Sequence, residues 1–239
     1  MEIDTAIVTD LAPTGALRAS INLGNPILAQ GTPEAPTGVT VDIARELGSR
    51  LGVPVELVAF HAAKSAFEAM PGGLADVCFL AIEPVRAAVV AFTAPYVLIE
   101  GVFAVPKRSG LTTVADVDQP GVRIGVAGGS AYDLYLSRTF QHAELVRGED
   151  AIVEFRTHGL EAVAGIRQPL GAYVATQSDL RLIDERFMQI RQAVGTTKAR
   201  QPATVRYLQE LVEELKATGF IADALRRAGQ LDAEVAPPA

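Results

Sequence analysis

The chain has few of the residues that build metal centres, disulfides and cofactor sites. Its 239 residues include one cysteine, Cys78, no tryptophan and three histidines that are scattered without ligand-like spacing. A single cysteine excludes an intrachain disulfide and a cysteine-rich metal site, and we expect Cys78, inside an apolar run, to be a small buried side chain. The glycines of residues 125–129 lack the spacing of a dinucleotide or phosphate-binding loop. We therefore expect no metal and no cofactor.

Basic charge and long apolar runs are also scarce. The formal net charge is −7, and an acidic chain without a basic stripe is a poor partner for nucleic acid. No apolar run approaches the roughly 20 residues that span a bilayer, so we expect no direct membrane insertion. With 49% hydrophobic and 21% charged residues, the composition is that of an ordinary globular protein. The length allows one large domain or two small ones.

The beginning of the chain lacks the features of a secretory signal. Such a signal starts with basic residues followed by an apolar stretch of about 7–15 residues, whereas residues 1–4 read Met-Glu-Ile-Asp. As written, the chain is expected to be cytoplasmic. The alternative is that a leader was removed and replaced by Met1.

The first half of the sequence alternates between strand and helix patterns. Residues 39–51 place Val41, Ile43, Ala44 and Leu47 on one helical face, and Gly52 follows them. The order strand, helix, strand, helix, strand up to residue 82 predicts parallel strands covered by helices on both faces. Ligands of such sheets gather beyond the carboxyl ends of the strands. The expected strands are residues 16–22, 53–60 and 77–82, the expected helices are 39–51 and 62–70, and residues 23–38 are expected to form a loop.

The alternation of strand and helix patterns is repeated in the second half of the sequence. It predicts strands at 122–126, 143–147 and 160–166, helices at 131–140 and 152–158, and a long helical region at 204–229 that is broken at Gly219. Residues 96–105 and 187–191 are expected to be crossing strands, and residues 231–239 a frayed tail. We expect an α/β protein of two doubly wound lobes joined by two hinge strands. Lobe 1 takes residues 1–104 and 191–239, and lobe 2 takes residues 105–190.

The stretch from Asp76 to Lys107 carries the clearest functional signal. An apolar strand run ends at Glu83-Pro84, where proline suits the first turn of a helix, and Arg86 follows in that turn. A guanidinium at the mouth of a strand can bind a carboxylate through two parallel hydrogen bonds. The alternative is a structural ion pair of Arg86 with Glu83 or Glu100.

This segment resembles the type II periplasmic solute-binding proteins of the polar-amino-acid group, which serve ABC transporters. The resemblance rests on the order of an Asp-led apolar strand, an arginine, a Phe-Thr-x-Pro-Tyr motif and a second apolar strand. It implies the two-lobe fold, a small carboxylate-bearing ligand, a membrane permease as partner, a monomer and a periplasmic location. The residues that carry it are Asp76, Arg86, Phe92, Thr93, Pro95, Tyr96 and Gly101.

The resemblance also implies which residues line the ligand site. In the family the arginine matched by Arg86 grips the ligand carboxylate, and the loop matched by Gly129 and Ser130 binds the ligand from the second lobe. Alternatively, the side-chain amides of Asn22 and Asn25 only hold the turn of their loop. Gly129 and Ser130 could likewise form an ordinary helix cap. The expected ligand-binding residues are Arg86, Asn22, Asn25, His61, Phe79, Ala81, Gly129, Ser130, Ala131, Tyr132 and Arg167.

Two departures from the family pattern bear on the ligand. Relatives that bind amino acids have an acidic residue where this chain has Ile166-Arg167, and serines where it has Phe79 to Ala81. The first change removes the anion that would meet an ammonium group, and the second makes the wall more apolar. These changes favour an organic acid, or a dicarboxylate held by Arg86 and Arg167. Alternatively, Arg167 is an exposed surface residue without a role in ligand binding.

Two other classes of protein are alternatives to a transport-linked binding protein: a dehydratase and a sensor domain. Dehydratases of this fold need a carboxylate acid, and Glu83 and Glu100 are the acidic residues at predicted strand ends, neither with a histidine partner. We expect a binding protein rather than an enzyme. The second alternative is a detached cytoplasmic sensor domain of the same fold.

Overall fold

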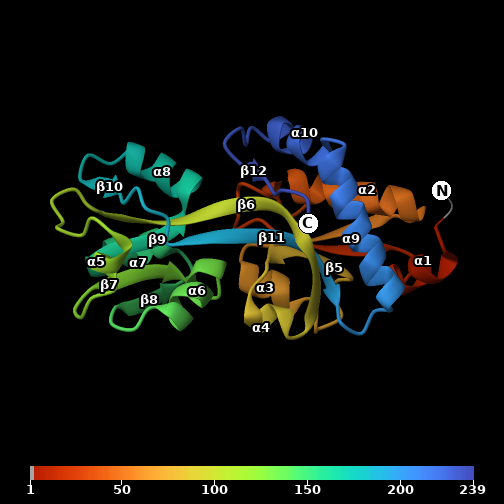
Figure 1. The fold of residues 1–239 in the computed structure, drawn as a ribbon, viewed down its shortest axis with the longest axis horizontal. Coiled ribbons are helices and arrows are strands. Elements are labelled where there is room, and N and C mark those ends of the chain that lie inside the picture. The colour runs from red at the N-terminus through yellow and green to blue at the C-terminus, as the bar shows by residue number, and fades with distance from the viewer. Residues whose placement is uncertain (1–2) are drawn as a thin grey trace. The chain divides into compact units, whose positions relative to one another are not determined.

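The computed structural model describes residues 3–239, and they form two compact α/β units (Figure 1). Of the described residues, unit 1 contains 3–98 and 191–239, and unit 2 contains 99–190. The sequence predicts the boundaries after residues 104 and 190. Each unit has a central sheet flanked by helices, which confirms the predicted α/β class.

In unit 1 three strands lie in the order β4, β1, β5, and they are parallel, as predicted. Asn22 at the end of β1 pairs with Phe60 at the end of β4, and Ser20 pairs with Cys78 of β5. The fourth strand, β11, runs antiparallel to β5. The bounds are β1 Leu17–Asn22, β2 Gln30–Thr32, β3 Ala35–Thr37, β4 Val55–Phe60, β5 Val77–Ala81 and β12 Glu234–Val235.

The helices of unit 1 follow the apolar periodicity of the sequence. In α2 the predicted apolar face is buried, and Gly52 ends the helix in the left-handed conformation, with φ 68°. Gly219 likewise separates α9 from α10 with φ 79°. The bounds are α1 Thr5–Leu11, α2 Val39–Leu51, α3 Ala63–Glu68, α4 Pro84–Ala87, α9 Pro202–Ala217 and α10 Phe220–Arg227.

Unit 2 repeats the arrangement with β8, β7 and β9 in parallel order. Strand β6 runs antiparallel to β9, with Gly101 opposite Ile166, and β10 runs antiparallel to β6. The buried core of this unit includes Val102, Phe155 and Val163. The bounds are α5 Val114–Val117, β7 Arg123–Ala127, α6 Ala131–Thr139, β8 Glu144–Gly148, α7 Ala151–His158, β9 Ala162–Ile166, α8 Arg167–Ala175 and β10 Leu180–Leu182.

Two long strands each belong partly to both units. Strand β6 spans Val90–Pro106 and β11 spans Met188–Thr197, so both are longer than the sequence predicted. Within unit 2, a Cβ atom on Gly101 would lie 2.8 Å from ring and side-chain carbons of Phe187 and Met188. Glycine therefore lets β6 approach these two side chains closely.

Several elements were missed or wrongly assigned from sequence. Helices α1 and α8 were not predicted, and the loop of residues 23–38 contains the hairpin β2–β3. The tail is not frayed, because β12 pairs with β6 and the backbone N–H of Ala236 donates to the carbonyl of Tyr96. Lys216 also donates to the Pro237 carbonyl at 2.8 Å. These are long-range contacts, which local periodicity does not reveal.

Cys78 lies in the hydrophobic core of unit 1, as predicted. It packs with Met70, Leu80 and Val90, and its side chain is fully buried. Burial raises the pKa of the thiol to about 12, although the positive charge of Arg86 counteracts part of that rise. A thiol with such a pKa stays protonated at neutral pH and is a poor nucleophile.

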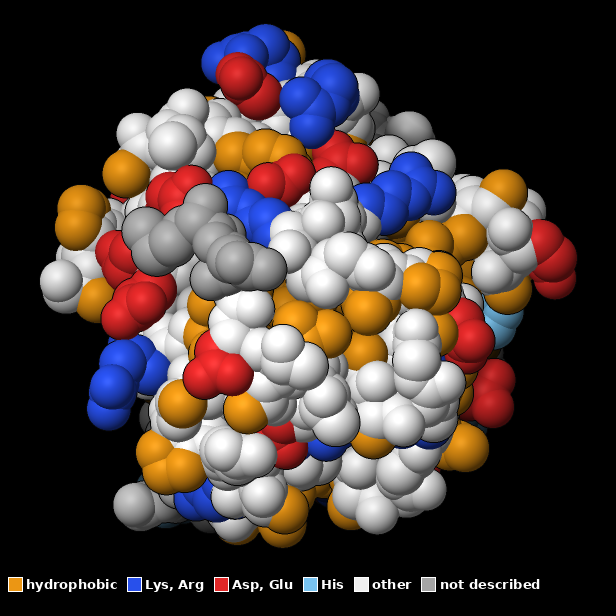
Figure 2. All heavy atoms as spheres, turned by 90° about the vertical axis from the view of Figure 1, so that its right-hand side faces the viewer, with side chains coloured by type: hydrophobic (Ala, Val, Ile, Leu, Met, Phe, Trp, Pro, Cys, Tyr) orange, Lys and Arg blue, Asp and Glu red, His pale blue; other side chains and the backbone are white. Residues whose placement is uncertain are grey.

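Charged side chains of both signs are mixed on the face of the molecule that carries α1. Figure 2 shows this face, with acidic and basic side chains next to one another rather than sorted by sign. Helix α10 carries an exposed ion pair of Arg226 and Asp223. Such exposed pairs contribute little to stability.

A buried carboxylate joins four segments of unit 1. Asp76 is fully buried and accepts hydrogen bonds from the guanidinium of Arg18 at 2.8 and 2.9 Å and from that of Arg200 at 2.7 Å. Its own carbonyl accepts a hydrogen bond from the Thr196 hydroxyl. The start of β5 is thereby tied to β1, to β11 and to the segment before α9.

We expect Asp76→Ala to lower the free energy of unfolding by about 3–5 kcal/mol, because it leaves two partly buried guanidinium groups without their carboxylate. Chemical denaturation measures this loss. The matched control is Asp223→Ala, which removes an exposed carboxylate and should change stability by about 0.5 kcal/mol or less. Equal losses in the two variants would contradict the assignment.

Candidate functional site

The predicted anchor, Arg86, lies in α4 directly beyond the carboxyl end of β5. Its side chain is only 2% exposed, so it is not a solvated surface arginine. The Nη1 atom donates to the carbonyl oxygen of Ala81, the last residue of β5, at 3.3 Å. Because a proline opens α4, the helix begins close enough to the strand for this contact.

A second charged side chain is buried at the same strand end. Glu83 occupies the N-cap position of α4 and is 2% exposed, and its carboxylate makes no cap hydrogen bond to that helix. Burial lowers the pKa of Arg86, and the negative charge of Glu83 counteracts part of this effect. The two groups therefore interact electrostatically.

The amides of the first loop hold its turns. Asn22 Oδ1 accepts from the backbone N–H of Gly24 at 3.0 Å, and Asn25 Oδ1 accepts from that of Ile27 at 3.2 Å. Asn25 is buried, while His61, after β4, is exposed. The turn-holding role of both amides is thus observed, and a ligand role for them and for His61 stays a prediction.

The strand that precedes Arg86, β5, is apolar, as its sequence indicates. Phe79 and Ala81 are 1% and 2% exposed and belong to a strand that is buried throughout. This strand contributes backbone carbonyl groups, rather than side-chain donors, to its carboxyl end. The polar groups at this strand end are therefore its backbone carbonyl groups and the charged residues that follow.

In unit 2 the loop before α6 is organised by an acidic side chain. Asp133 is buried; its Oδ2 accepts from the Gly129 N–H at 2.8 Å, and its Oδ1 accepts from Arg147 Nε at 2.9 Å. Ser130 is the N-cap, and its hydroxyl oxygen accepts from the Asp133 N–H. The alternative of an ordinary helix cap is therefore observed for Ser130, and the Gly129 N–H already has a carboxylate partner.

The next two predicted residues begin α6. Ala131 is buried, and Tyr132 is half-buried. Burial raises the pKa of the Tyr132 hydroxyl, and hydrogen bonding to Ser130 offsets part of the rise. This tyrosine supports the Ser130 loop from within unit 2.

Arg167, at the start of α8, belongs to a cluster of three charged side chains in unit 2. Its Nε donates to Glu100 Oε2, and its Nη2 donates to the Asp184 carbonyl at 2.8 Å. Arg186 donates to the other oxygen of Glu100 at 2.9 Å. A ligand carboxylate at Arg167 would have to compete with Glu100.

Sequence reasoning did not choose Glu83, Asp133 or Glu100 as site residues. Glu83 carried a usable signal, because an acidic residue that directly follows a fully apolar strand lies at the edge where ligands gather. Asp133 follows Ser130 by three residues, which is the spacing of a capping interaction. Glu100 had no local signal, since its partner Arg167 is 67 residues away.

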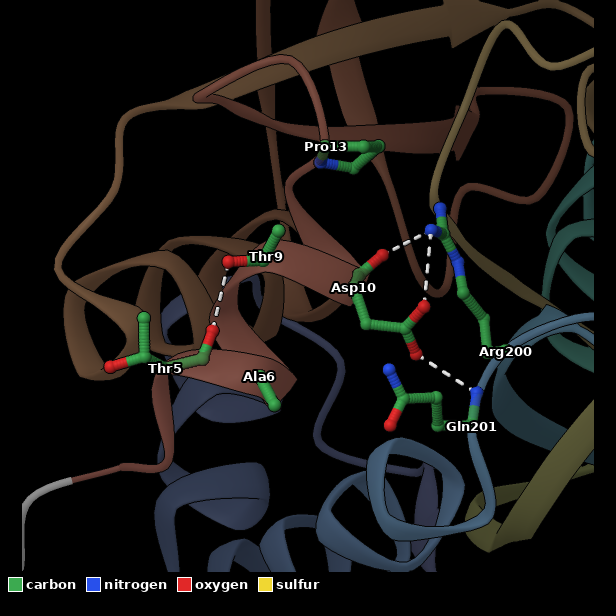
Figure 3. Close-up of a pocket in the computed structure, with 7 residues that line it drawn as sticks. All are labelled: Thr5, Ala6, Thr9, Asp10, Pro13, Arg200 and Gln201. Carbon is green, nitrogen blue, oxygen red and sulfur yellow. Dashed lines mark hydrogen bonds and ion pairs between the residues drawn. The ribbon is translucent and has the colours of Figure 1, made fainter.

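A surface pocket lies elsewhere in unit 1, between α1 and the start of α9 (Figure 3). Its lining includes Thr9, Asp10, Arg200 and Gln201. The carboxylate of Asp10 accepts from the Gln201 N–H, and Arg200 donates to the Asp10 carbonyl. These bonds cap α9 and hold α1 in place, and no predicted site residue lines the pocket.

Metal chelation and membrane spanning find no support in residues 3–239. No group of three or more His, Cys, Asp or Glu side chains in this range is arranged to hold a metal ion. The same residues contain no helix that combines the length and apolar character needed to cross a bilayer.

Comparison with known proteins identifies the family. The model of the bacterial extracellular solute-binding proteins, family 3, matches residues 22–229. The chain belongs to this family. No match was found among proteins with curated descriptions.

Solved structures show the same fold. A mutant of ArgBP from T. maritima superposes with a TM-score of 0.77 at 22% identity, covering 93% of this chain and 99% of that one. The amino acid ABC transporter substrate-binding protein AbpA from Streptococcus pneumoniae, bound to L-arginine, has a TM-score of 0.76 at 19% identity, covering 94% and 98%. The ancestral amino acid-binding protein AncCDT-1, a precursor of cyclohexadienyl dehydratase, has a TM-score of 0.75 at 18% identity, covering 92% and 97%.

The Glu100 cluster predicts an acid-sensitive contribution to stability. Burial alone would raise the pKa of Glu100, but hydrogen bonds from Arg167 and Arg186 outweigh it and leave the pKa below its usual value. The contribution is therefore complete above the unfolded-state pKa of about 4.3 and is lost as pH falls through the lower folded-state pKa.

Thermal unfolding of the wild type and Glu100→Gln should accordingly differ at neutral pH and converge as pH falls below about 4. Glu34→Gln, at an exposed position, is the control and should follow the wild type throughout. A difference between wild type and Glu100→Gln that persists unchanged into acid would contradict the role of Glu100.

Proposed function

We propose that this chain binds a small carboxylate-bearing ligand through Arg86 and delivers it to an ABC permease. The observation that carries the proposal is a guanidinium, 2% exposed, at the carboxyl end of β5. An arginine offers planar, paired donors that match a carboxylate. Removed from water, each such charge-assisted hydrogen bond is stronger than it would be on the surface.

In unit 2, the predicted ligand-binding residues gather at the start of α6. Ser130, Ala131 and Tyr132 lie at the N-terminus of a nine-residue helix, whose dipole favours a negative group. Asp133 already provides one negative charge there, through its bond to the Gly129 N–H. We therefore assign the main electrostatic attraction for the ligand to Arg86 rather than to the α6 loop.

The named ligands of the similar structures favour an amino-acid-like ligand. AbpA is described as bound to L-arginine, and a putative binding component of an ABC transporter from Wolinella succinogenes as complexed with lysine. In this chain the cluster of Arg167, Arg186 and Glu100 carries one excess positive charge, which disfavours a cationic ligand end near it. The role of Arg167 as a second carboxylate clamp would require it to exchange Glu100 for the ligand.

A transport protein and a cytoplasmic sensor of this fold would have different protein partners, so neighbouring genes can distinguish the two roles. Genes for a permease and its ATPase beside the gene for this chain would support transport. A neighbouring gene for a transcription regulator or a receptor would support the sensor.

We expect Arg86→Lys to weaken ligand binding about tenfold or more, because lysine keeps the charge but loses the paired donors. The measurement is a thermal-shift screen of the wild type against the twenty amino acids and a panel of organic acids. Isothermal titration of the best compound with the variant then gives the loss of affinity.

The matched control is Arg206→Lys, which makes the same exchange at an exposed position of α9 and should leave affinity unchanged. Circular dichroism of both variants verifies that they fold. Undiminished binding by folded Arg86→Lys would remove Arg86 as the anchor.

Dehydratase activity is the second candidate, because AncCDT-1 is described as a precursor of such an enzyme and Glu83 is a buried acid in this chain. Incubation with prephenate, followed by ultraviolet absorbance of the aromatic product, tests it. We expect no turnover above the uncatalysed rate, and product formation that disappears in Glu83→Gln would establish the enzyme instead.

A further inference from the structure

The carboxylate of Asp133, the third residue of α6, joins three parts of unit 2. Its Oδ2 atom accepts from the backbone N–H of Gly129, in the loop before the helix, at 2.8 Å. Its Oδ1 atom accepts from Nε of Arg147, in β8, at 2.9 Å. The Asp133 N–H in turn donates to the hydroxyl of Ser130, the N-cap of α6, at 3.1 Å. One buried side chain therefore connects the loop, the helix and the neighbouring strand.

Asp133 reaches further back than the acid of an ordinary capping box. In that motif the acid accepts from the backbone N–H of the N-cap residue. Here the N–H of Ser130 donates to the carbonyl of Ala127 instead, and the Asp133 carboxylate binds Gly129, one residue before the cap. Gly129 has φ 73°, a left-handed conformation that glycine adopts readily. Asp133 thereby fixes the path by which the chain enters α6.

Helix α5 shows the ordinary arrangement in the same unit. Its third residue, Asp116, accepts from the N–H of the N-cap, Thr113, at 2.8 Å. Asp133 differs from Asp116 because it is 4% exposed, binds the residue before the cap and is paired with an arginine. A simple cap needs none of these features. They fix the loop that holds the predicted ligand-binding residues Gly129 and Ser130.

Arg147 holds the Asp133 carboxylate from the side of the sheet. It pairs with Val126 at the end of β7, next to the point where the loop leaves that strand. Its Nη2 donates to the Ser137 hydroxyl at 2.7 Å, and this hydroxyl donates to the carbonyl of Asp133 at 2.7 Å. The guanidinium is half-exposed, whereas the carboxylate that it binds is buried. The orientation of the carboxylate is thus fixed from two directions.

The ion pair also determines the charge at the start of α6. The N–H groups in the first turn of a helix have no partner within the helix and, with the helix dipole, favour a negative group. An uncompensated Asp133 carboxylate would oppose this effect and repel a ligand carboxylate. Arg147 compensates that charge, so Asp133 can hold the loop without repelling an acid.

We propose that Asp133 and Arg147 are positioning residues for ligand binding by unit 2. Asp133 fixes the loop that presents the start of α6, and Arg147 orients and neutralises Asp133. The inference rests on the proposed function, in which Ser130, Ala131 and Tyr132 line the ligand site. Both positioning residues act through this loop rather than by touching the ligand.

The first test removes the carboxylate. The probes are L-glutamine, L-glutamate and succinate, whose net charges at neutral pH are about 0, −1 and −2, together with the compound that the wild type binds most tightly in the thermal-shift screen. Isothermal titration compares the wild type with Asp133→Ala. We expect the variant to bind the tightest compound about tenfold more weakly or worse, because the loop is no longer preorganised. Equal affinity of the folded variant would overturn the inference.

The second test separates charge compensation from loop geometry. Arg147→Gln leaves the Asp133 carboxylate uncompensated, so its loss of affinity should grow with the negative charge of the probe. The loss should shrink in about 0.5 M salt, which screens the repulsion. Arg147→Lys keeps the positive charge and should restore most of the affinity. A loss that is independent of salt and is not restored by lysine would overturn the inference.

The controls make matched changes elsewhere in unit 2. Asp116→Ala removes the corresponding acid of α5, and Arg123→Gln breaks the ion pair with Glu161 at the start of β7. Both should lower the unfolding temperature and leave affinity unchanged. Losses in the controls as large as those of Asp133→Ala and Arg147→Gln would show a structural role only, and overturn the inference.

Failure of the inference can be distinguished from failure of the proposed function. If the wild type binds none of the compounds, the proposed function fails and the inference with it. Binding that is unaffected by the two positioning variants overturns the inference alone. Should Asp133→Ala not fold, the salt dependence of Arg147→Gln and its rescue by lysine still decide the question.

Discussion

The buried carboxylate of Asp76 is the interaction on which the arrangement of unit 1 depends. It binds Arg18 of β1 and Arg200 before α9, and the Asp76 carbonyl binds Thr196 of β11. These contacts come from four separate stretches of the chain, and together they fix the start of β5. A buried charge of this kind is stable only while its partners stay in place, so it specifies one arrangement of these segments.

Strand β5 follows Asp76 and runs to the charged residues beyond its carboxyl end. Five buried apolar residues lead from Asp76 to Glu83 and Arg86, so the position of both charged side chains follows from the strand. An inert thiol, Cys78, lies within the strand and packs into the core. Beyond the strand, Pro84 begins α4, and the two buried charged residues of this segment, Glu83 and Arg86, flank that proline.

Two acidic side chains of unit 2, Asp133 and Glu100, already have basic partners within the unit. Asp133 takes the Gly129 N–H and the Arg147 guanidinium, and Glu100 takes Arg167 and Arg186. Charges that are paired in this way lower the electrostatic attraction for a second ion. The proposed ligand contact is for this reason placed in unit 1, where Arg86 is buried at the carboxyl end of β5.

The sequence by itself determined the α/β class, most strands and helices, the burial of Cys78 and the position of Arg86 beyond β5. These features follow from local patterns: apolar runs, helical periodicity, and proline or glycine at element ends. Tertiary structure decided the partner of Arg167, the pairing of the tail through β12, and the joining of Asp76 to Arg18 and Arg200. Each of these depends on groups far apart in the chain, and only the folded backbone brings such groups within hydrogen-bonding distance.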